Sequence, residues 1–394
     1  MDISPSGLNQ RFNEEAVTFL KSELESAVEK TVSISEQLKS KLSKAFNRVL
    51  PIDSSGWGLH KKLKDLFPGC GGSGSPAGVK LQCMFDLLTS TFILFDITIG
   101  KIPDQKYTRN IPSWLKKGDL VLPDLGYFCL SVMKEIIAIG AFFVSRYLHG
   151  TILYIKVNGE FQKLDLFKLL REYKTHSLLE LNVYMGAEKV PCRLIAVRLP
   201  EEQRNEKLRK LKEKAKKRGR TLSKQERFLA PWNIYVTNVN SETLTAIDVA
   251  QMYRLRWSVE LLFKQFKSTL KMHVWSHGNQ FRLKCELLAT LIVATIIMSF
   301  HGLAQAMLWR TAKKEISFEK LFKLFKNSAY QLFSALTLSL RELQQTFRDL
   351  FAQIQKYCKK ESRKSRPSSL QALLFHKNVR CTTISLRTLK RFAT

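Results

Sequence analysis

Residues 253–267 read YRLRWSVELLFKQFK, a stretch in which polar and apolar positions alternate with helical spacing. At about 100° per residue, Tyr253, Arg256, Glu260 and Lys267 fall within an arc of roughly 60°. The apolar residues of the stretch and its continuation lie on the opposite side: Leu255, Val259, Leu262, Phe263, Phe266 and Leu270. The spacing predicts a helix that packs by its apolar face and presents an aromatic ring, two cations and one carboxylate on the other.

A simpler interpretation of this helix is a solvated surface with an Arg256–Glu260 pair at positions i and i+4. Exposed pairs of that kind are common and contribute little to stability. On the pattern of the helix alone, this interpretation is favoured. A functional role for this helix becomes the favoured interpretation only when carboxylates elsewhere in the chain are taken into account.

Two aspartates directly follow predicted strands. Residues 49–52 form a strand candidate that ends at Asp53, and the apolar run 120–123 leads into Asp124. The ends of strands are where an α/β domain gathers its ligands. Two aspartates and a helical glutamate, here Glu260, can hold two Mg²⁺ ions, which are hard cations that prefer oxygen. Such a pair activates an attacking oxygen and stabilises the leaving oxygen in phosphodiester chemistry.

Other potential ligands compete with this set. Asp86 and Asp96 also follow apolar runs, but a first strand should precede the two strands that hold them, which favours Asp53. His273 and His277 are four residues apart, a spacing that suits metal binding. Because no third ligand accompanies them, we expect surface or DNA-facing histidines.

The charge of the chain indicates a polyanionic partner. Among 394 residues, Lys and Arg number 64 and Asp and Glu 34, so the formal net charge is +30. Lysine and arginine replace condensed counterions along phosphates, and nucleic acid is therefore the expected partner. A basic protein bound to ribosomes or to a membrane surface is the alternative. The odd number of cysteines, seven, without a C-x-x-C pair predicts reduced thiols in a cytoplasmic protein.

The run 287–308 is apolar over about the thickness of a membrane. It contains His301, Gln305 and several hydroxyl side chains. We therefore predict a buried core helix and no membrane partner.

The order of predicted elements indicates an α/β protein with an insertion. Residues 8–50 are expected to be helical, and strands are expected at 79–87, 90–98 and 141–145, with a helix at 130–140 between the last two. From 151 to 238 short alternating strands predominate, around a basic run at 204–220 that is either a solvated helix face or a DNA contact. After Leu244 the chain is expected to be helical to near Tyr357, followed by a basic arm.

We accordingly predict five regions. They are a helical N-terminal segment at 1–48, the first part of the core at 49–150, a β-rich insertion at 151–240, the second part of the core at 241–310, and a helical C-terminal region with a basic tail at 311–394.

The spacing Y-x2-R-x3-E-x6-K, matched in full by Tyr253, Arg256, Glu260 and Lys267, resembles the signature of DDE transposases of bacterial insertion sequences, the insertion sequence 4 type. Matching stretches also begin at Asp53 (DSS), Asp124 (DLGYF), Phe143 (FVSR) and Val236 (VTNV). The resemblance implies an RNase H-like core, a mixed sheet flanked by helices, interrupted by the β-rich insertion. It implies an enzyme that cleaves DNA at element ends and joins the freed 3′-hydroxyl to target DNA.

The resemblance also implies roles for individual residues. Asp53, Asp124 and Glu260 would bind two Mg²⁺ ions, with Mn²⁺ as a substitute, and a homodimer would act on paired DNA ends in the cytoplasm, at the nucleoid. Tyr253, Arg256 and Lys267 would bind phosphates at the transposon end. Further DNA-binding candidates are Arg146, Lys264 and Trp232. Trp232 would stack on an unstacked base, although a buried core tryptophan is an equal alternative.

By the resemblance, relatives usually carry a helical DNA-binding region before the segment with which this sequence begins. A truncated copy, an internally started product and a decayed element are the three interpretations that follow. Two rival functions follow from the sequence. One is a non-catalytic DNA-binding protein that inhibits the full-length transposase. The other is an RNase H-like nuclease acting on RNA–DNA hybrids or junctions.

Overall fold

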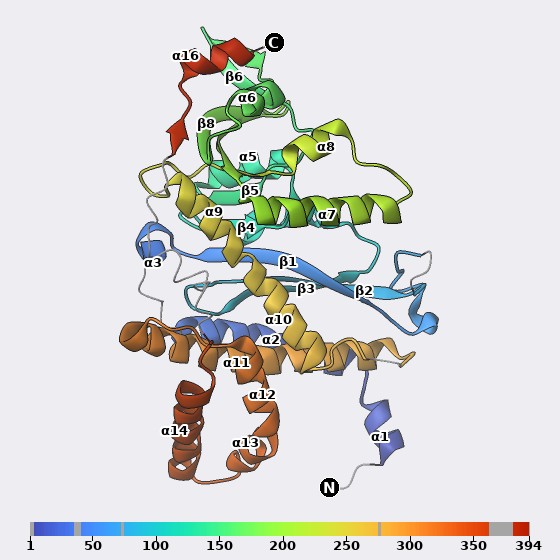
Figure 1. The fold of residues 1–394 in the computed structure, drawn as a ribbon. Coiled ribbons are helices and arrows are strands. Elements are labelled where there is room, and N and C mark those ends of the chain that lie inside the picture. Colours follow the sequence, from blue (N-terminus) through green and yellow to red (C-terminus); the bar gives the residue numbers. More distant parts are fainter. Residues whose placement is uncertain (1–3, 35–40, 72–74, 275–276, 362–380, 394) are drawn as a thin grey trace. The chain divides into compact units, whose positions relative to one another are not determined.

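The protein is described by a computed structural model covering residues 4–34, 41–71, 75–274, 277–361 and 381–393 (Figure 1). The chain divides into two compact units. The first contains Met1–Asp104 and Arg256–Gln371, and the second contains Gln105–Leu255 and Ala372–Thr394. Each unit combines strands with helices, so the predicted α/β class is confirmed.

Strands β1 (Val49–Gly58), β2 (Gly78–Phe85) and β3 (Phe92–Ile99) form an antiparallel sheet in the first unit. Asp53 is paired with Cys83, and Gln82 with Asp96. The first half of β1 is buried, as its apolar residues predict, and the strands expected at 79–87 and 90–98 are present with slightly different ends.

The prediction that the first strand ends at Asp53 is wrong, because β1 continues for five residues to Gly58. Its polar and glycine-containing second half pairs with β2 from Ser54 opposite Gln82 to Gly58 opposite Gly78. Cross-strand hydrogen bonds therefore extend the strand through residues of low intrinsic strand preference. Asp53 projects from the middle of a strand rather than from its end.

The helices of the first unit begin with α1 (Pro5–Gln10), α2 (Glu14–Ile34) and α3 (Lys41–Ala45), so the continuous helix expected over 8–50 is interrupted. The C-terminal helices are α10 (Trp257–Ser268), α11 (Gln280–Ala312), α12 (Phe318–Asn327), α13 (Ala329–Ala335) and α14 (Leu340–Tyr357). Helices α2 and α11 lie side by side (Figure 1). The rings of Phe85, Phe92, Phe266 and Phe322 meet in the core that the sheet and these helices share.

Helix α11 is long and apolar enough to cross a membrane by length and composition alone. More than half of its most apolar window, 56%, is buried inside the protein. Its polar residues His301 and Gln305 are buried as well, and Gln305 donates to the carbonyl of Lys314. This is the packing of a core helix, as the sequence predicts.

The second unit is built on a mixed sheet with the strand order β4-β5-β10-β9-β8-β6-β7. The strands are β4 (Leu120–Pro123), β5 (Phe142–Arg146), β6 (Leu153–Val157), β7 (Glu160–Lys163), β8 (Leu178–Met185), β9 (Val190–Arg198) and β10 (Trp232–Thr237). Strand β5 is parallel to β4 and antiparallel to β10. A short strand, β11 (Thr382–Thr383), pairs in parallel with β8.

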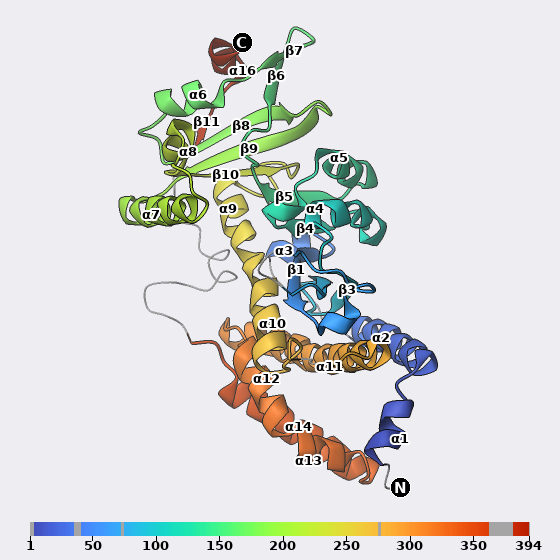
Figure 2. The same ribbon diagram turned by 90° about the vertical axis from the view of Figure 1, so that its right-hand side faces the viewer.

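Helices of the second unit include α5 (Leu130–Ile139), α6 (Leu166–Glu172), α7 (Glu201–Lys217), α8 (Lys224–Leu229), α9 (Ala246–Leu255) and α16 (Leu386–Leu389). Gly140 ends α5 in the left-handed conformation at φ 77°, which glycine adopts without strain. The basic run at 204–220 forms most of α7, which lies beside α8 in Figure 2.

The single helix predicted through 253–267 is two helices. Helix α9 ends at Leu255 and α10 begins at Trp257. Arg256 between them keeps helical dihedral angles, but its carbonyl accepts from the amide of Val259, three residues on. This tighter bonding pattern interrupts the regular helix at the residue that carries the guanidinium of the motif.

Candidate active site

The guanidinium of Arg256 joins two of the predicted catalytic carboxylates. Its Nη1 lies 3.2 Å from Oδ2 of Asp53, which is on β1. Its Nη2 donates to Oε1 of Glu260, in the first turn of α10. The exposed fractions of these side chains are 11% for Arg256, 17% for Asp53 and 30% for Glu260, so water reaches Glu260 most freely.

The packing of α10 places these groups together. Val259, Leu262, Phe263 and Phe266 are buried in the first unit, and α10 lies against β1. Arg256 and Glu260 are four residues apart and therefore share one side of the chain, next to the Asp53 strand. Two carboxylates beside one guanidinium carry an excess of one negative charge, which favours the binding of an added cation.

Lys267, the last residue of the motif, also contacts β1. Its Nζ donates to the carbonyl of Gly56 at 3.2 Å and lies 6.0 Å from the centre of the Trp57 ring. Burial lowers the pKa of the Lys267 ammonium below its usual value. Lys264, by contrast, is exposed. Among the predicted DNA-binding cations of α10, Lys264 is thus the one with open access to a ligand.

Asp124 belongs to the second unit, whereas Asp53 and Glu260 belong to the first. It follows β4 directly, as predicted, and its half-buried carboxylate caps a short 3₁₀ turn, Leu125–Tyr127. Oδ2 accepts from the amide of Gly126 at 3.5 Å. The backbone at Asp124 is extended, so the side chain leaves the sheet where β4 ends.

Tyr253 sits in an aromatic and cationic cluster of the second unit and is only 5% exposed. Its ring centre lies 5.5 Å from that of Tyr235 and 5.5 Å from Cζ of Arg146. Its hydroxyl donates to the carbonyl of Pro123 at 3.4 Å. The prediction that the helix presents Tyr253 on the side opposite its packed face is wrong, because strands β4, β5 and β10 all supply contacts to the ring and hydroxyl.

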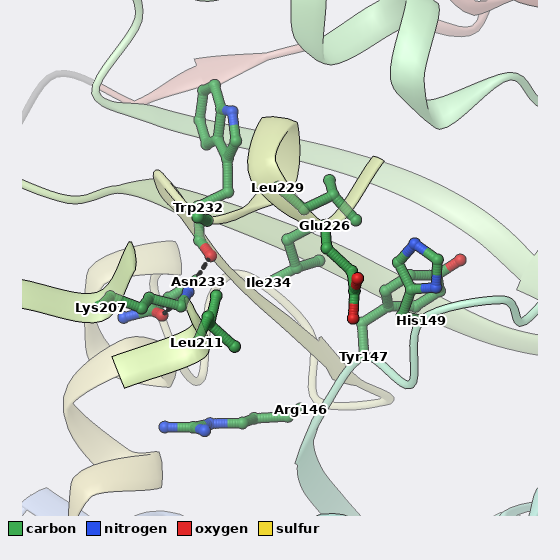
Figure 3. Close-up of a pocket in the computed structure, with 11 residues that line it drawn as sticks. Arg146, Tyr147, His149, Lys207, Leu211, Glu226, Leu229, Trp232, Asn233 and Ile234 are labelled. Atoms are coloured by element: carbon green, nitrogen blue, oxygen red, sulfur yellow. Dashed lines mark hydrogen bonds between the residues drawn. The ribbon is translucent and has the colours of Figure 1, made fainter. Parts of the chain in front are cut away.

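A cavity of about 280 Å³ opens in the second unit beside Arg146 (Figure 3). Lys207 of helix α7 lies at this cavity, and its Nζ donates to the carbonyl of Trp232 at 2.7 Å and to Oδ1 of Asn233 at 3.0 Å. Burial, and secondly the charge of Arg146, lower the pKa of Lys207 to about 8. The sequence placed Lys207 only in a basic run, because a lysine that anchors a helix to a strand has no distinct sequence signal.

Trp232 contributes mainly its backbone to this cavity. Its indole is 4% exposed and points away from Arg146 in Figure 3. Of the two sequence-based interpretations, the geometry favours the buried core residue. Stacking on a base would require the indole to become accessible.

Sequence comparisons bear on this arrangement. The profile of the family described as "Transposase DDE domain" matches residues 44–296, a span that includes Asp53, Asp124 and Glu260. The chain belongs to the DDE transposase family. This chain is 30% identical over 376 residues to the transposase for insertion sequence element IS231E of Bacillus thuringiensis subsp. finitimus. The aligned residues make up 92% of this chain and 79% of the relative. The chain is also 30% identical over 350 residues to the transposase for insertion sequence element IS1151 of Clostridium perfringens. That alignment covers 84% of this chain and 74% of the relative.

The mixed α/β organisation of the transposase fits the RNase H-like fold of its family. Within the first unit the structure also distinguishes the competing carboxylates. Asp86 is buried, and its oxygens accept from the amides of Val49 and Leu88 and from the hydroxyl of Thr89. These contacts give Asp86 a role in holding the turn after β2. Desolvation by burial is the main reason that the pKa of its carboxyl is raised.

The donor chemistry around Arg256 fits a hard divalent cation. Asp53 and Glu260 supply carboxylate oxygens, the ligands that Mg²⁺ and Mn²⁺ accept. Over the residues that the structure describes, no group of three or more His, Cys, Asp or Glu side chains meets the geometry of a metal centre. His273 is exposed, and Nε2 of His277 lies 3.8 Å from Oε1 of Glu286.

Proposed function

We propose that the transposase cleaves DNA at insertion-sequence ends and transfers the freed strand into target DNA, in a reaction that requires divalent metal ions. The observation that supports this most strongly is the joining of Asp53 and Glu260 by Arg256. The three residues come from β1 and from the start of α10, which are separated by about half of the chain. Polar side chains from distant parts of the sequence are expected to meet at a reaction site. A solvated surface helix does not require such a contact.

Asp53, Asp124 and Glu260 are the proposed ligands of two Mg²⁺ ions, which Mn²⁺ would replace. Bound metal ions of this type activate an attacking oxygen and stabilise a leaving oxygen in phosphodiester chemistry. Within the chain, Arg256 holds the carboxylates of Asp53 and Glu260 in place and offsets their mutual repulsion. Asp124 is assigned from the resemblance of DLGYF and from its position directly after β4.

DNA is the proposed partner, in line with the net charge of +30. The relatives are named as transposases for insertion sequence elements, and by that likeness the substrate is the end of such an element. The proposed phosphate contacts come from Arg256, Lys267, Arg146 and the exposed Lys264. We further propose that the protein acts as a homodimer on paired DNA ends and that it is located at the nucleoid. We also propose that the chain consists of five regions, at 1–48, 49–150, 151–240, 241–310 and 311–394.

The test is cleavage of labelled duplexes carrying the inverted repeats that flank the gene, with Mg²⁺ or Mn²⁺ added. Asp53→Asn, Asp124→Asn and Glu260→Gln should each abolish nicking while leaving DNA binding intact. Asp96→Asn is the matched control, because Asp96 lies on β3 of the same sheet, which β2 separates from β1. It should cleave like the unchanged protein.

Cleavage by Glu260→Gln at the unchanged rate would refute the assignment of the site. Salt-sensitive DNA binding without cleavage under any divalent metal would show the inhibitory DNA-binding function instead. Preference for RNA–DNA hybrids over element ends would identify a nuclease of a different kind.

A further inference from the structure

We propose that the C-terminal end of helix α7, residues 212–218, binds the phosphate backbone of DNA without regard to base sequence. This surface rests on the proposed function in one respect, because DNA is taken as the partner. From the sequence, the basic run at 204–220 is either a solvated helix face or a DNA contact. In the structure the two parts of α7 differ in charge, and only the second part has the surplus that a DNA contact needs.

The cations in the first part of α7 are neutralised by glutamates one turn away. Nη2 of Arg209 lies 2.9 Å from Oε1 of Glu206, and its Nη1 lies 3.0 Å from Oε1 of Glu213. Nζ of Lys210 lies 3.1 Å from the same Glu206 oxygen. The hydrogen bonds from Arg209 and then from Lys210 lower the pKa of the Glu206 carboxyl to about 2. This part of the helix is therefore a solvated face with exposed ion pairs.

The C-terminal end of the helix lacks this compensation. Five exposed cations, here called the basic end of α7, lie within seven residues: Lys212, Lys214, Lys216, Lys217 and Arg218. Across the described residues none of the five is in an ion pair, and the one glutamate among them, Glu213, is bonded to Arg209. Like charges four residues apart, such as Lys212 and Lys216, destabilise a helix. A bound polyanion would relieve this repulsion.

The helix dipole does not account for so much charge. Cations in the last turn stabilise a helix because its C-terminus carries about half a negative charge. The basic end has five positive charges, and Lys212 lies before the last turn. Most of the positive charge is therefore available to a ligand.

The density of this charge suits a DNA duplex. Residues 212–218 cover about 9 Å of helix axis, at 1.5 Å per residue. A duplex carries one phosphate per ~1.7 Å of its axis, so about five phosphates lie along the same length. The number of cations thus matches the number of phosphates that they would face.

The composition of α7 favours DNA over a membrane or a protein partner. Its apolar side chains face the protein, since Leu208 and Leu211 are half-buried and Ala215 is buried. A helix that lies on a membrane turns an apolar face outward. Lysine is depleted in protein–protein interfaces, whereas lysine and arginine are common contacts of DNA phosphates. Phosphate contacts carry no base information, so the expected binding is independent of sequence.

The basic end is held in a defined position within the second unit. Lys207 anchors the preceding turns of α7 to Trp232 and Asn233 of β10. After the helix, Gly219 takes a left-handed conformation at φ 65°, and its amide donates to the carbonyl of Lys216 at 3.0 Å. The chain then returns to α8 through a loop that is visible in Figure 1. A surface on a packed helix holds its charges in place better than a mobile tail.

The test compares two double variants of the full chain. Lys212→Gln with Lys216→Gln removes two charges from the basic end. Arg209→Gln with Lys210→Gln is the matched control, because it removes two charges from the neutralised part of the same helix. Glutamine has nearly the helix propensity of lysine and arginine, so both proteins should fold, and urea denaturation checks this. The Kd is measured without divalent metal at several salt concentrations, for a labelled element end and for an unrelated duplex of equal length.

The variant in the basic end should bind both duplexes more weakly at low salt. The slope of log K against log salt concentration should become shallower by about 2, as for the loss of two phosphate contacts. The control should keep the slope of the unchanged protein, because glutamates already hold its two cations.

An unchanged slope in the Lys212→Gln, Lys216→Gln protein would overturn the proposal, and so would an equal change in the control. A change confined to the element end would also overturn it, because the contact would then depend on sequence. Cleavage with Mg²⁺ is measured separately. A chain that gives the expected slopes but never cleaves refutes the proposed function and leaves the basic end as a DNA contact.

Discussion

Nη1 of Arg256 lies 3.2 Å from Oδ2 of Asp53, although the two residues are 203 positions apart in the sequence. The same guanidinium also bonds to Glu260, four residues on, in the first turn of α10. An arginine has a planar group with several donors in fixed directions, and can hold two carboxylates at once. Arg256 is therefore the residue through which β1 and α10 share one polar site.

Arg256→Lys should damage this site despite keeping the charge. A lysine ammonium lacks the planar fork that bonds to two carboxylates together. We expect cleavage to fall by about 100-fold, as for loss of a group that orients metal ligands. The free energy of unfolding should fall by about 1–2 kcal/mol, the range for hydrogen bonds to charged groups. Cleavage assays and urea denaturation measure the two effects.

Arg282→Lys is the control for this substitution. Arg282 bonds to Glu286 four residues on, as Arg256 does to Glu260, but at a more exposed position of α11. It should change neither quantity appreciably. An Arg256→Lys variant with unchanged cleavage would show that the bridging geometry is unimportant.

Arg193 on β9 should be needed for the placement of α9. Its buried guanidinium donates to the carbonyls of Val239 and Leu244, at 2.7 and 2.9 Å, in the segment that leads into α9. It also bonds to Glu180 on β8 at 2.6 Å. Arg193→Gln leaves Glu180 without its cation and should reduce the free energy of unfolding by about 3 kcal/mol.

A double-mutant cycle tests this explanation. If the pair with Glu180 dominates, adding Glu180→Gln to Arg193→Gln should cost much less than the sum of the two single changes. Strict additivity in urea denaturation would show that the two side chains act independently.

Gly302 allows α11 to approach the turn between β2 and β3. A Cβ atom at this position would lie 2.3 Å from the backbone oxygen of Thr89, so Gly302→Ala forces the backbone to move. The helical preference of alanine favours the variant by about 1 kcal/mol. Overpacking of a core costs typically more, and we expect a net loss of about 2 kcal/mol. Thermal denaturation measures this loss of stability. Val293→Ala, at an exposed position of the same helix, should leave the stability nearly unchanged in the same measurement.

A Gly302→Ala protein as stable as the unchanged chain would mean that α11 and the turn separate easily. In that case, the hydrogen bond between His301 and Ser90, at 2.9 Å, would not indicate tight packing at this place.

His301 should make the protein sensitive to mild acid. Desolvation by burial lowers the pKa of its imidazole from 6.5 to about 4. The folded state therefore keeps it neutral, whereas the unfolded state binds a proton below pH 6.5. Stability from this group is complete above pH 6.5 and is lost as the pH falls toward 4, by about 1 kcal/mol per pH unit.

Urea denaturation between pH 7 and pH 4.5 measures this effect, with His301→Gln for comparison. The variant should lose less stability than the unchanged protein as the pH falls. His273→Gln makes the same chemical change at an exposed position and should follow the unchanged protein. Parallel curves for all three proteins would contradict the prediction.

Much of the local structure could be predicted from the sequence. The strand at Leu120–Pro123 and the helix after Leu130 follow from apolar patterning and from turn formers such as Gly140. These elements are determined by neighbouring residues, and such signals lie within a few positions. The α/β class and the four polar residues of the motif were accessible for the same reason.

The sequence by itself also determined the chemistry of the site: carboxylates, cations and a phenol at fixed spacing. Only the tertiary structure decided what each group touches. Strand β1 passes through Asp53 because β2 pairs with it, and Tyr253 is buried because strands far away in the sequence surround it. Arg256 meets Asp53 because α10 packs on β1. Spacing along a helix defines which side chains share a side, but long-range packing defines what that side faces.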